Sequence, residues 1–291
     1  MSLVVVSGDG RVCDPEQPLL FADDLAALRG DGVFETVLVR NGRALLVDRH
    51  LDRLVDGAAA LALPPPDRAG LHRAVAVAAG EWAATAGSEG GTVAEGMLRV
   101  SYSRGRESRP DGPPTCYLTV GPVAGRVAAA RRDGVSAITL ERGLATETAA
   151  QAPWLLTGIK ALAYAANTAA LRHAAQRGAD DAIFLAADGS VLEGPRSTVV
   201  IASGGALSTP PRSGAILPGT TQAALFDLAA ARGIPAMQRR LTLDDLRGAD
   251  GVWLLSSISL AARVHTLDGA SLALRSGLDV AALVDEAVAD R

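Results

Sequence analysis

The sequence predicts an α+β protein of two domains, and three observations lead to that prediction. With 291 residues the chain is long for a single hydrophobic core. Strand-like runs stand in groups beside amphipathic helices and do not alternate strictly with them. Glycine, alanine and arginine replace the strand pattern near the middle of the chain. We therefore expect a smaller N-terminal domain over 1–122, a linker over 123–133 and a larger C-terminal domain over 134–291.

The first half contains four strand-like runs and two amphipathic helical patterns. The pair Asn41-Gly42 lies between the first two runs and predicts a tight hairpin turn. The runs lie at 32–42, 43–48, 97–105 and 115–123, and the helical patterns lie at 48–63 and 66–87.

The second half begins with a strand-like run at 134–141 and a helical pattern that ends near Gly178. Strands over 181–203 are expected to turn at Asp188-Gly189. A Pro-Gly turn then precedes a helix that begins with Thr220 and Thr221 and is closed by Gly233. The last strands, over 251–269, are joined by a turn rich in serine.

Composition excludes several classes of protein. A net charge of −4 and the lack of a strong basic run argue against nucleic acid as a partner. No apolar run reaches the roughly 18 residues of a membrane span. Two cysteines and four scattered histidines make a disulfide framework or a metal site unexpected. The N-terminal apolar run has no basic residue before it and Asp9 follows it, so we expect a cytoplasmic protein without a signal peptide.

Lys160 is the only lysine among 28 basic residues. A lysine amine can lose its proton, act as a nucleophile and form a Schiff base, and an arginine cannot. Tyr164, Asn167 and Leu171 follow Lys160 at +4, +7 and +11, a spacing that predicts one face of a helix. The sequence therefore makes Lys160 a candidate for carbonyl or pyridoxal-phosphate chemistry.

Pyridoxal phosphate needs an anion at its pyridinium nitrogen and donors for its phosphate, and the chain offers both. Glu193 stands where a strand turns at Gly194. The helix start at Gly219, Thr220 and Thr221 offers N–H groups and hydroxyls to an anion. Taken one at a time, such residues are also ordinary turn and capping residues.

Two further sets of side chains could contact the phosphate. Ser256 and Ser257 could add hydroxyls from the serine-rich turn, although such turns are common. Arg53 could pair bidentately with a phosphate from its helix, and a solvated helix arginine is the competing interpretation.

Seven motifs in order give the chain a resemblance, nearly end to end, to the class IV, fold-type IV family of pyridoxal-phosphate enzymes. The motifs are GDGVFET, HLDRL, SRG, GIKALAYAAN, DDAIFLAADGSVLEGPRSTVV, LPGTTQ and SSISLAARV followed by LDG. The family includes branched-chain aminotransferases, D-amino acid aminotransferases and 4-amino-4-deoxychorismate lyases.

The resemblance implies pyridoxal phosphate as cofactor, bound to Lys160 through a Schiff base, with Glu193 at the pyridinium. It implies that Arg53, Thr220 and Thr221 hold the phosphate and that Lys160 takes a proton from the substrate. The cofactor-binding residues that it implies are Arg53, Lys160, Tyr164, Glu193, Leu217, Gly219, Thr220, Thr221 and Ser257. It also implies a homodimer, with the cofactor between the two domains and near the partner subunit.

The residues that match the substrate contacts of the family favour a lyase. Arg104 and Arg109 follow a strand, and Arg109 matches an arginine that can hold a substrate carboxylate. Phe34 stands where D-amino acid aminotransferases use a tyrosine, and Ile258 replaces a threonine of transaminases. Tyr164 lies four residues after the lysine, whereas branched-chain enzymes have their tyrosine five residues after it.

We therefore expect a 4-amino-4-deoxychorismate lyase, which gives 4-aminobenzoate and pyruvate for folate synthesis. The alternative is a class IV aminotransferase, D-specific rather than branched-chain, and one protein could do both because the steps up to proton abstraction are shared. A non-catalytic binding protein with the same fold is the remote alternative.

Overall fold

The computed structural model describes residues 3–87, 94–212 and 215–289. The chain divides into two compact units, each made of two stretches of sequence. The first unit contains residues 1–124 and 159–164, and the second contains 125–158 and 165–291. Each unit has a sheet of its own, which confirms the two-domain α+β architecture. No helix in the described part of the chain is long and apolar enough to cross a membrane.

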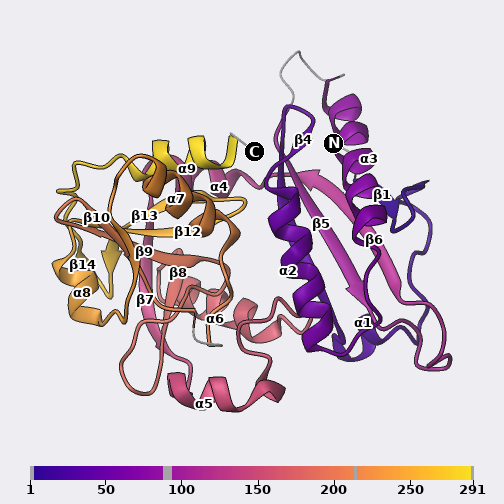
Figure 1. The fold of residues 1–291 in the computed structure, drawn as a ribbon, viewed down its shortest axis with the longest axis horizontal. Coiled ribbons are helices and arrows are strands. Elements are labelled where there is room, and N and C mark those ends of the chain that lie inside the picture. The colour runs from indigo at the N-terminus through magenta and orange to yellow at the C-terminus, as the bar shows by residue number, and fades with distance from the viewer. Residues whose placement is uncertain (1–2, 88–93, 213–214, 290–291) are drawn as a thin grey trace. The chain divides into compact units, whose positions relative to one another are not determined.

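The first unit is an antiparallel sheet of six strands in the order β2-β1-β6-β5-β3-β4. Helices α2 and α3 pack against one face of it (Figure 1). The strands are β1 (Val4–Ser7), β2 (Val12–Cys13), β3 (Gly32–Arg40), β4 (Arg43–Ala44), β5 (Gly96–Ser103) and β6 (Thr115–Pro122), and the helices are α1 (Leu25–Arg29), α2 (Val47–Ala60) and α3 (Arg68–Gly87).

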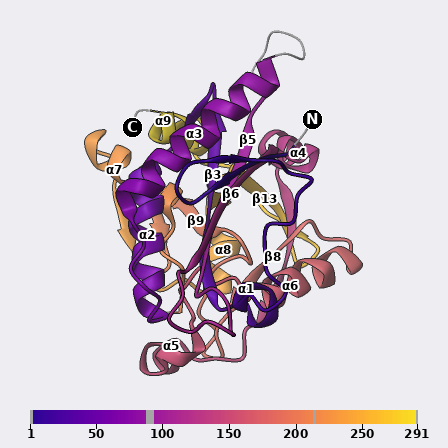
Figure 2. The ribbon, with the colours of Figure 1, turned by 90° about the vertical axis from the view of Figure 1, so that its right-hand side faces the viewer.

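The core of the first unit lies between the sheet and these two helices, which share one side of the strands in Figure 2. Leu51 and Leu54 of α2, Trp82 of α3 and Leu98 of β5 are almost fully buried there. The predicted hairpin at Asn41-Gly42 is confirmed: β3 and β4 pair antiparallel, and both turn residues have positive φ. This framework fixes the register of β3, which carries Phe34 and Glu35.

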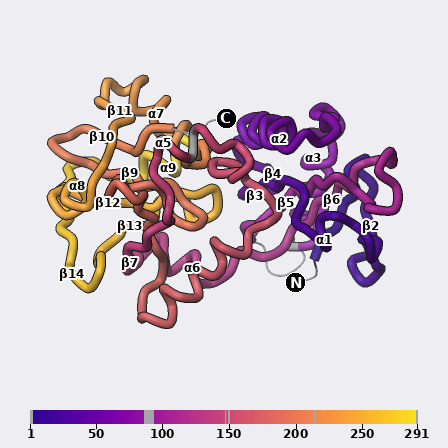
Figure 3. The backbone as a smooth tube through the Cα atoms, turned by 90° about the horizontal axis from the view of Figure 1, so that it is seen from below, coloured from indigo at the N-terminus to yellow at the C-terminus, as the bar shows by residue number. Residues whose placement is uncertain are grey.

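The second unit is built on an eight-stranded sheet in the order β11-β10-β9-β12-β13-β7-β8, with β14 beside β13. Helices α6 and α7 lie on opposite sides of its strands (Figure 3). The strands are β7 (Val135–Glu141), β8 (Asp181–Leu185), β9 (Thr198–Ser203), β10 (Ala206–Thr209), β11 (Ala236–Gln238), β12 (Gly251–Ser256), β13 (Leu260–Leu267) and β14 (Ala270–Ser271). The helices are α4 (Gly125–Asp133), α5 (Thr146–Gln151), η1 (Pro153–Leu155), α6 (Ala165–Gln176), α7 (Thr220–Ala231), α8 (Leu243–Gly248) and α9 (Val280–Ala289).

Several predicted elements of the second half are present. The turn at Asp188-Gly189 is confirmed, with Gly189 at φ +77° and the chain returning antiparallel to β8. Helix α7 begins at Thr220 as predicted, and Gly233 follows its end. The stretch predicted as a linker, 123–133, consists mostly of α4, which packs on β13.

The helix predicted around Lys160 is wrong at the lysine itself. Helix α6 begins only at Ala165, and Lys160 lies in an irregular segment before it. That segment pairs with β3, because Phe34 N–H donates to the Lys160 carbonyl at 3.0 Å and Leu162 N–H donates to the Gly32 carbonyl at 2.8 Å. The segment therefore belongs to the first unit, although the sequence placed the lysine in the C-terminal domain.

Candidate active site

The amine of Lys160 lies beside two aromatic rings of the first unit. Its Nζ is 4.6 Å from the ring centre of Phe34 and 5.6 Å from that of Tyr164. The two rings meet edge to face, with their centres 5.2 Å apart. Phe34 is buried and sits on β3, directly beside the strand pairing that holds Lys160. The fold thus places the only lysine against an apolar wall, and the sequence had predicted each of these three residues.

Two glycines of the GDGVFET motif allow the lysine segment to come this close to β3. A side chain at Gly32 would put its Cβ 2.5 Å from the Tyr102 carbonyl and 2.6 Å from Leu162. Gly30 has φ +66°, and a Cβ there would lie 2.8 Å from the backbone nitrogen of Ala163. The motif therefore provides the space that the lysine segment occupies.

Arg53 is held by a buried network that the sequence analysis missed. Its Nε and Nη2 both donate to the carboxylate of Glu35, at 2.7 Å each. His50 Nδ1 lies 2.7 Å from the same carboxylate. Glu35 and His50 are 0% and 1% exposed. The available signal was the charge pattern: Glu35 stands in an apolar strand, with His50 and Arg53 three apart on the helix that covers it.

Opposing effects set the charges in this network. Burial opposes the ionisation of Glu35, but the charge of Arg53 and the hydrogen bond of His50 hold the pKa of Glu35 well below its usual value. Burial lowers the pKa of His50, and Glu35 offsets that shift only in part. The network therefore consists of an ionised Glu35, a neutral His50 that donates from Nδ1, and a charged Arg53.

The sequence analysis also missed Arg99, which lies beside Phe34. The guanidinium carbon of Arg99, on β5, lies 3.8 Å from the ring centre of Phe34. Its hydrogen-bond partner in the described chain is Ser101 Oγ at 3.4 Å, and burial lowers its pKa. A half-buried cation beside the lysine and its rings is suited to a substrate carboxylate. The signal in the sequence was an arginine among the apolar residues of β5.

The two arginines predicted as substrate contacts have different environments. Arg104 donates from Nε to Asp31 at 2.7 Å and from Nη1 and Nη2 to the carbonyls of Ala62 and Leu61. Its guanidinium therefore ties the end of β5 to the residues that follow α1 and α2. Arg109 lies exposed in the loop between β5 and β6.

In the second unit, Glu193 is buried and its carboxylate is held from two sides. Arg142 Nη1 donates to Oε1 at 2.9 Å, and the backbone N–H of Leu217 donates to Oε2 at 3.0 Å. The structure thus brings two predicted cofactor contacts, Glu193 and Leu217, together. Arg142, at the end of β7, was not predicted.

The start of α7 has the features of an anion site. Gly219 is the N-cap, and a glycine has no side chain that could accept hydrogen bonds from the first N–H groups of the helix. Thr220 and Thr221 are buried, and Thr221 Oγ1 has no hydrogen-bond partner among the described residues. A Cβ at Gly219 would come within 2.3 Å of Thr198 Oγ1, so the turn has room only for glycine. These features fit the phosphate of pyridoxal phosphate.

The serine-rich turn between β12 and β13 is braced from α4. Ser259 N–H donates to Ser256 Oγ at 3.0 Å, and Arg131 Nε donates to the Ile258 carbonyl at 3.1 Å. Ser257 stands at the tip between them. Within 3–87, 94–212 and 215–289, no group of three or more His, Cys, Asp or Glu side chains could hold a metal ion.

Comparison with known proteins shows the family to which the chain belongs. The family model "Amino-transferase class IV" matches residues 32–267. The chain is 53% identical over 293 residues to the bifunctional aminodeoxychorismate lyase / D-amino acid transaminase of Mycobacterium tuberculosis, covering 98% of this chain and 99% of that one.

Two solved structures extend the likeness. A hypothetical aminotransferase from Mycobacterium tuberculosis in its PLP-bound form has a TM-score of 0.93 and 53% identity, with all of both chains covered. The 4-amino-4-deoxychorismate lyase of Pseudomonas aeruginosa has a TM-score of 0.76 and 25% identity, with 99% of each chain covered.

The chain therefore belongs to the class IV aminotransferase family and has the fold of the fold-type IV enzymes. It is a pyridoxal-phosphate-dependent enzyme. This confirms the family resemblance and the cofactor that the sequence predicted.

Proposed function

We propose that the protein is a 4-amino-4-deoxychorismate lyase that forms 4-aminobenzoate and pyruvate, with D-amino acid transamination as a second activity of the same site. The observation that carries this proposal is the 53% identity, over 98% of the chain, to a protein named for both activities. Phe34 supports the lyase, because a phenyl ring stands where the D-amino acid aminotransferases place a tyrosine hydroxyl.

We further propose the roles of the chain's own groups in the shared first step. Lys160 Nζ takes the proton from the substrate carbon that bears the nitrogen. When bound, pyridoxal phosphate supplies an electron sink for the pair that this proton leaves behind. Glu193 keeps the ring nitrogen protonated, and Arg142 and Leu217 hold its carboxylate in place. Arg53, Thr220, Thr221 and Ser257 hold the phosphate.

The two activities separate after that proton transfer. In the lyase reaction the proton at C4 of the ring passes to Lys160 Nζ, the C3–O bond to the enolpyruvyl group breaks, and the ring becomes aromatic. In transamination Lys160 Nζ would return the proton on the cofactor side, and water would then release a keto acid while the amino group stayed with the cofactor. Arg99 and Arg109 are the proposed contacts for the substrate carboxylates. Tyr164 is proposed as a cofactor contact because its ring flanks Lys160.

A product assay on the protein loaded with pyridoxal phosphate tests the proposal. Aminodeoxychorismate is given in one vessel, and D-alanine with 2-oxoglutarate is given in another. Release of 4-aminobenzoate and pyruvate without a keto-acid acceptor supports the lyase and a place in folate synthesis. Glutamate formed in the second vessel supports the second activity. If neither pair of products forms, the proposal is wrong.

We also propose a homodimer in the cytoplasm. The resemblance to the family supports the dimer, and the chemistry of folate synthesis supports the compartment. Size-exclusion chromatography with light scattering measures the assembly directly, and a mass of one chain would contradict it.

A further inference from the structure

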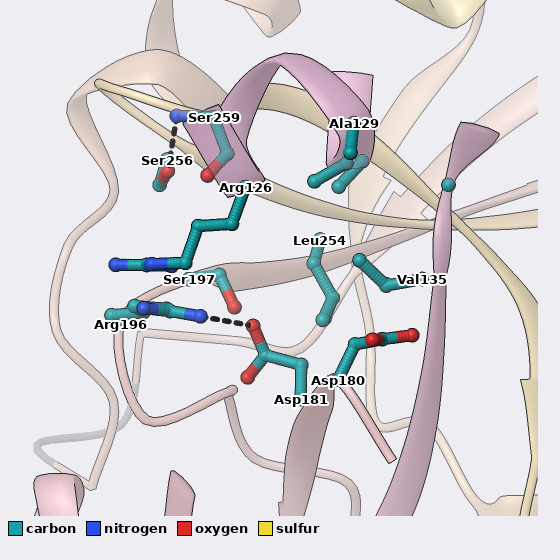
Figure 4. Close-up of a pocket in the computed structure, with 13 residues that line it drawn as sticks. Arg126, Ala129, Val135, Asp180, Asp181, Arg196, Ser197, Leu254, Ser256 and Ser259 are labelled. Carbon is teal, nitrogen blue, oxygen red and sulfur yellow. Dashed lines mark hydrogen bonds and ion pairs between the residues drawn. The ribbon is translucent and has the colours of Figure 1, made fainter. Parts of the chain in front are cut away.

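A cavity of about 180 Å³ lies within the second unit, beside the serine-rich turn (Figure 4). Since each water occupies roughly 30 Å³ of liquid, this volume has room for a small polyatomic ion. Its walls come from α4, β7, β8, β12, β13 and the loop after Glu193. The polar residues that line it are Arg126, Asp180, Asp181, Arg196, Ser197, Ser256 and Ser259.

Two guanidinium groups line this cavity, and one of them makes no ion pair within the described residues. Arg126 extends from α4 and makes no ion pair with any residue that the structure describes. Arg126 is exposed as a residue. Partial desolvation of its guanidinium and then the charge of Arg196 lower its pKa, and the charge of Asp181 opposes them. Figure 4 shows both side chains extending along the same wall. Two neighbouring cations favour an anion between or beside them.

Among the described residues, the two carboxylates that line the cavity make only one ion pair with its two guanidinium groups. Asp181 Oδ2 reaches Arg196 Nη2 at 3.4 Å, a long contact, and its Oδ1 accepts from the N–H of Ala182. Burial raises the pKa of Asp181, and the charges of Arg196 and Arg126 oppose that shift. Asp180 turns its carboxylate to Ser136, which donates from N–H and Oγ at 2.8 and 2.7 Å.

An unsatisfied hydroxyl points to the same place. Ser197 Oγ is buried and has no hydrogen-bond partner among the described residues. A buried hydroxyl without a partner costs about 1–3 kcal/mol, so such an atom in a cavity wall indicates a ligand or a water. Together with the two guanidinium groups, it supplies a third donor to one small volume.

We propose that this cavity binds an oxyanion, a carboxylate or a phosphate group, through Arg126, Arg196 and the hydroxyl of Ser197. The site is separate from the helix start at Thr220 and Thr221, which does not line the cavity. It shares the serine-rich turn with Ser257, so an anion here touches the same turn as the proposed cofactor contact. The proposal does not depend on which reaction the enzyme catalyses.

Isothermal titration calorimetry tests the proposal on the full chain saturated with pyridoxal phosphate, so that the cofactor site is filled. Inorganic phosphate is the probe in one arm and succinate in the other, so the two arms distinguish a phosphate site from a carboxylate site. We expect saturable binding in at least one arm. Arg126→Gln and Arg196→Gln should each weaken it about tenfold or more, the effect of losing a charge-assisted hydrogen bond.

Two further variants make the test specific. Arg132→Gln removes the same charge from α4, but its guanidinium pairs with Asp133 at the surface and does not line the cavity, so binding should not change. Asp181→Asn removes the competing charge and should strengthen binding, a result that misfolding does not produce. No saturable binding in either arm, or equal weakening in all three arginine variants, overturns the proposal.

Discussion

Glu35 and Arg53 form a bidentate ion pair, with two hydrogen bonds of 2.7 Å, under helix α2. Glu35 is fully buried and Arg53 is only 14% exposed on its side chain. The pair fixes the plane of the guanidinium that is proposed to hold the phosphate. Glu35 is therefore a positioning residue that acts through Arg53.

We predict that Glu35→Gln destabilises the protein by about 3 kcal/mol, because removal of one partner leaves a buried charge uncompensated. The dissociation constant of pyridoxal phosphate should also rise about tenfold. Urea denaturation and a fluorescence titration measure the two effects. Asp52→Asn is the control, since Asp52 pairs with Arg68 at the exposed side of the same helix. Equal stability and equal affinity in both variants would contradict the positioning role.

Lys160→Ala should abolish turnover, because no other lysine exists in the chain to replace it. Borohydride treatment of the loaded wild-type protein should fix the cofactor to the peptide that contains residue 160, and the variant should remain unlabelled. Mass spectrometry of the digested protein measures this. Measurable turnover in Lys160→Ala would refute the mechanism.

Glu193→Gln should slow turnover by about 100-fold or more, because a neutral amide no longer keeps the ring nitrogen protonated. Cofactor affinity should change only a few-fold, since the amide still accepts from the N–H of Leu217. Arg142→Gln should give a smaller loss, because it removes one support of the carboxylate and leaves the charge. Steady-state kinetics decides; unchanged turnover in Glu193→Gln excludes the assigned role.

The pH dependence of stability should report on His50. Its folded pKa lies below the ordinary 6.5, so below pH 6.5 the unfolded chain binds a proton that the folded chain does not. The free energy of unfolding should therefore fall from pH 7.5 to 5.5. Further loss of stability is expected below about pH 4.5. There the unfolded chain binds a proton at Glu35, whereas the folded chain, in which the pKa of Glu35 is lowered, does not.

His50→Gln should remove the part of this decline that lies above pH 5.5, because the amide does not titrate. Urea denaturation at three pH values compares the variant with the wild type. Identical slopes in the two proteins would mean that His50 does not cause the decline.

The two cysteines should differ in reactivity. Burial raises the pKa of Cys116 to about 12, and the thiolate is the reactive form. Both cysteines are partly exposed as residues, and Cys13 lies on the short edge strand β2. At pH 8 a disulfide reagent should therefore label one thiol per chain quickly, and Cys13→Ser should remove that fast phase. A fast phase that persists in Cys13→Ser would place the reactive thiol at Cys116.

The sequence predicted most of the fold from local signals. The Asn41-Gly42 hairpin and the start of α7 depend on turn and cap residues, and both are present. The helix around Lys160 failed because a strand partner decides that segment: the backbone of Lys160 pairs with β3, which lies more than 120 residues earlier. Local periodicity cannot reveal such a partner.

The same reason explains what was missed at the site. Lys160, Phe34 and Tyr164 were predicted, and the structure brings them together. The partners of the predicted residues come from other elements: Glu35, on β3, lies 18 residues before Arg53, and Arg142, just after β7, lies 51 residues before Glu193. Their roles depend on tertiary contacts, which a single sequence does not display.

A lysine-specific protease can cut the chain at one bond, between Lys160 and Ala161, because the chain has one lysine. That bond lies in the segment that pairs with β3. A protease needs an extended strand that it can take into its own cleft, and this segment already gives its hydrogen bonds to β3. The bond should therefore be cut only when the segment leaves the sheet, and Lys160 in its proposed Schiff base with the cofactor should not be recognised by the protease. The rate of cleavage at this bond should therefore measure how often the segment leaves the sheet, and the proposed bond between Lys160 and the cofactor should slow that cleavage.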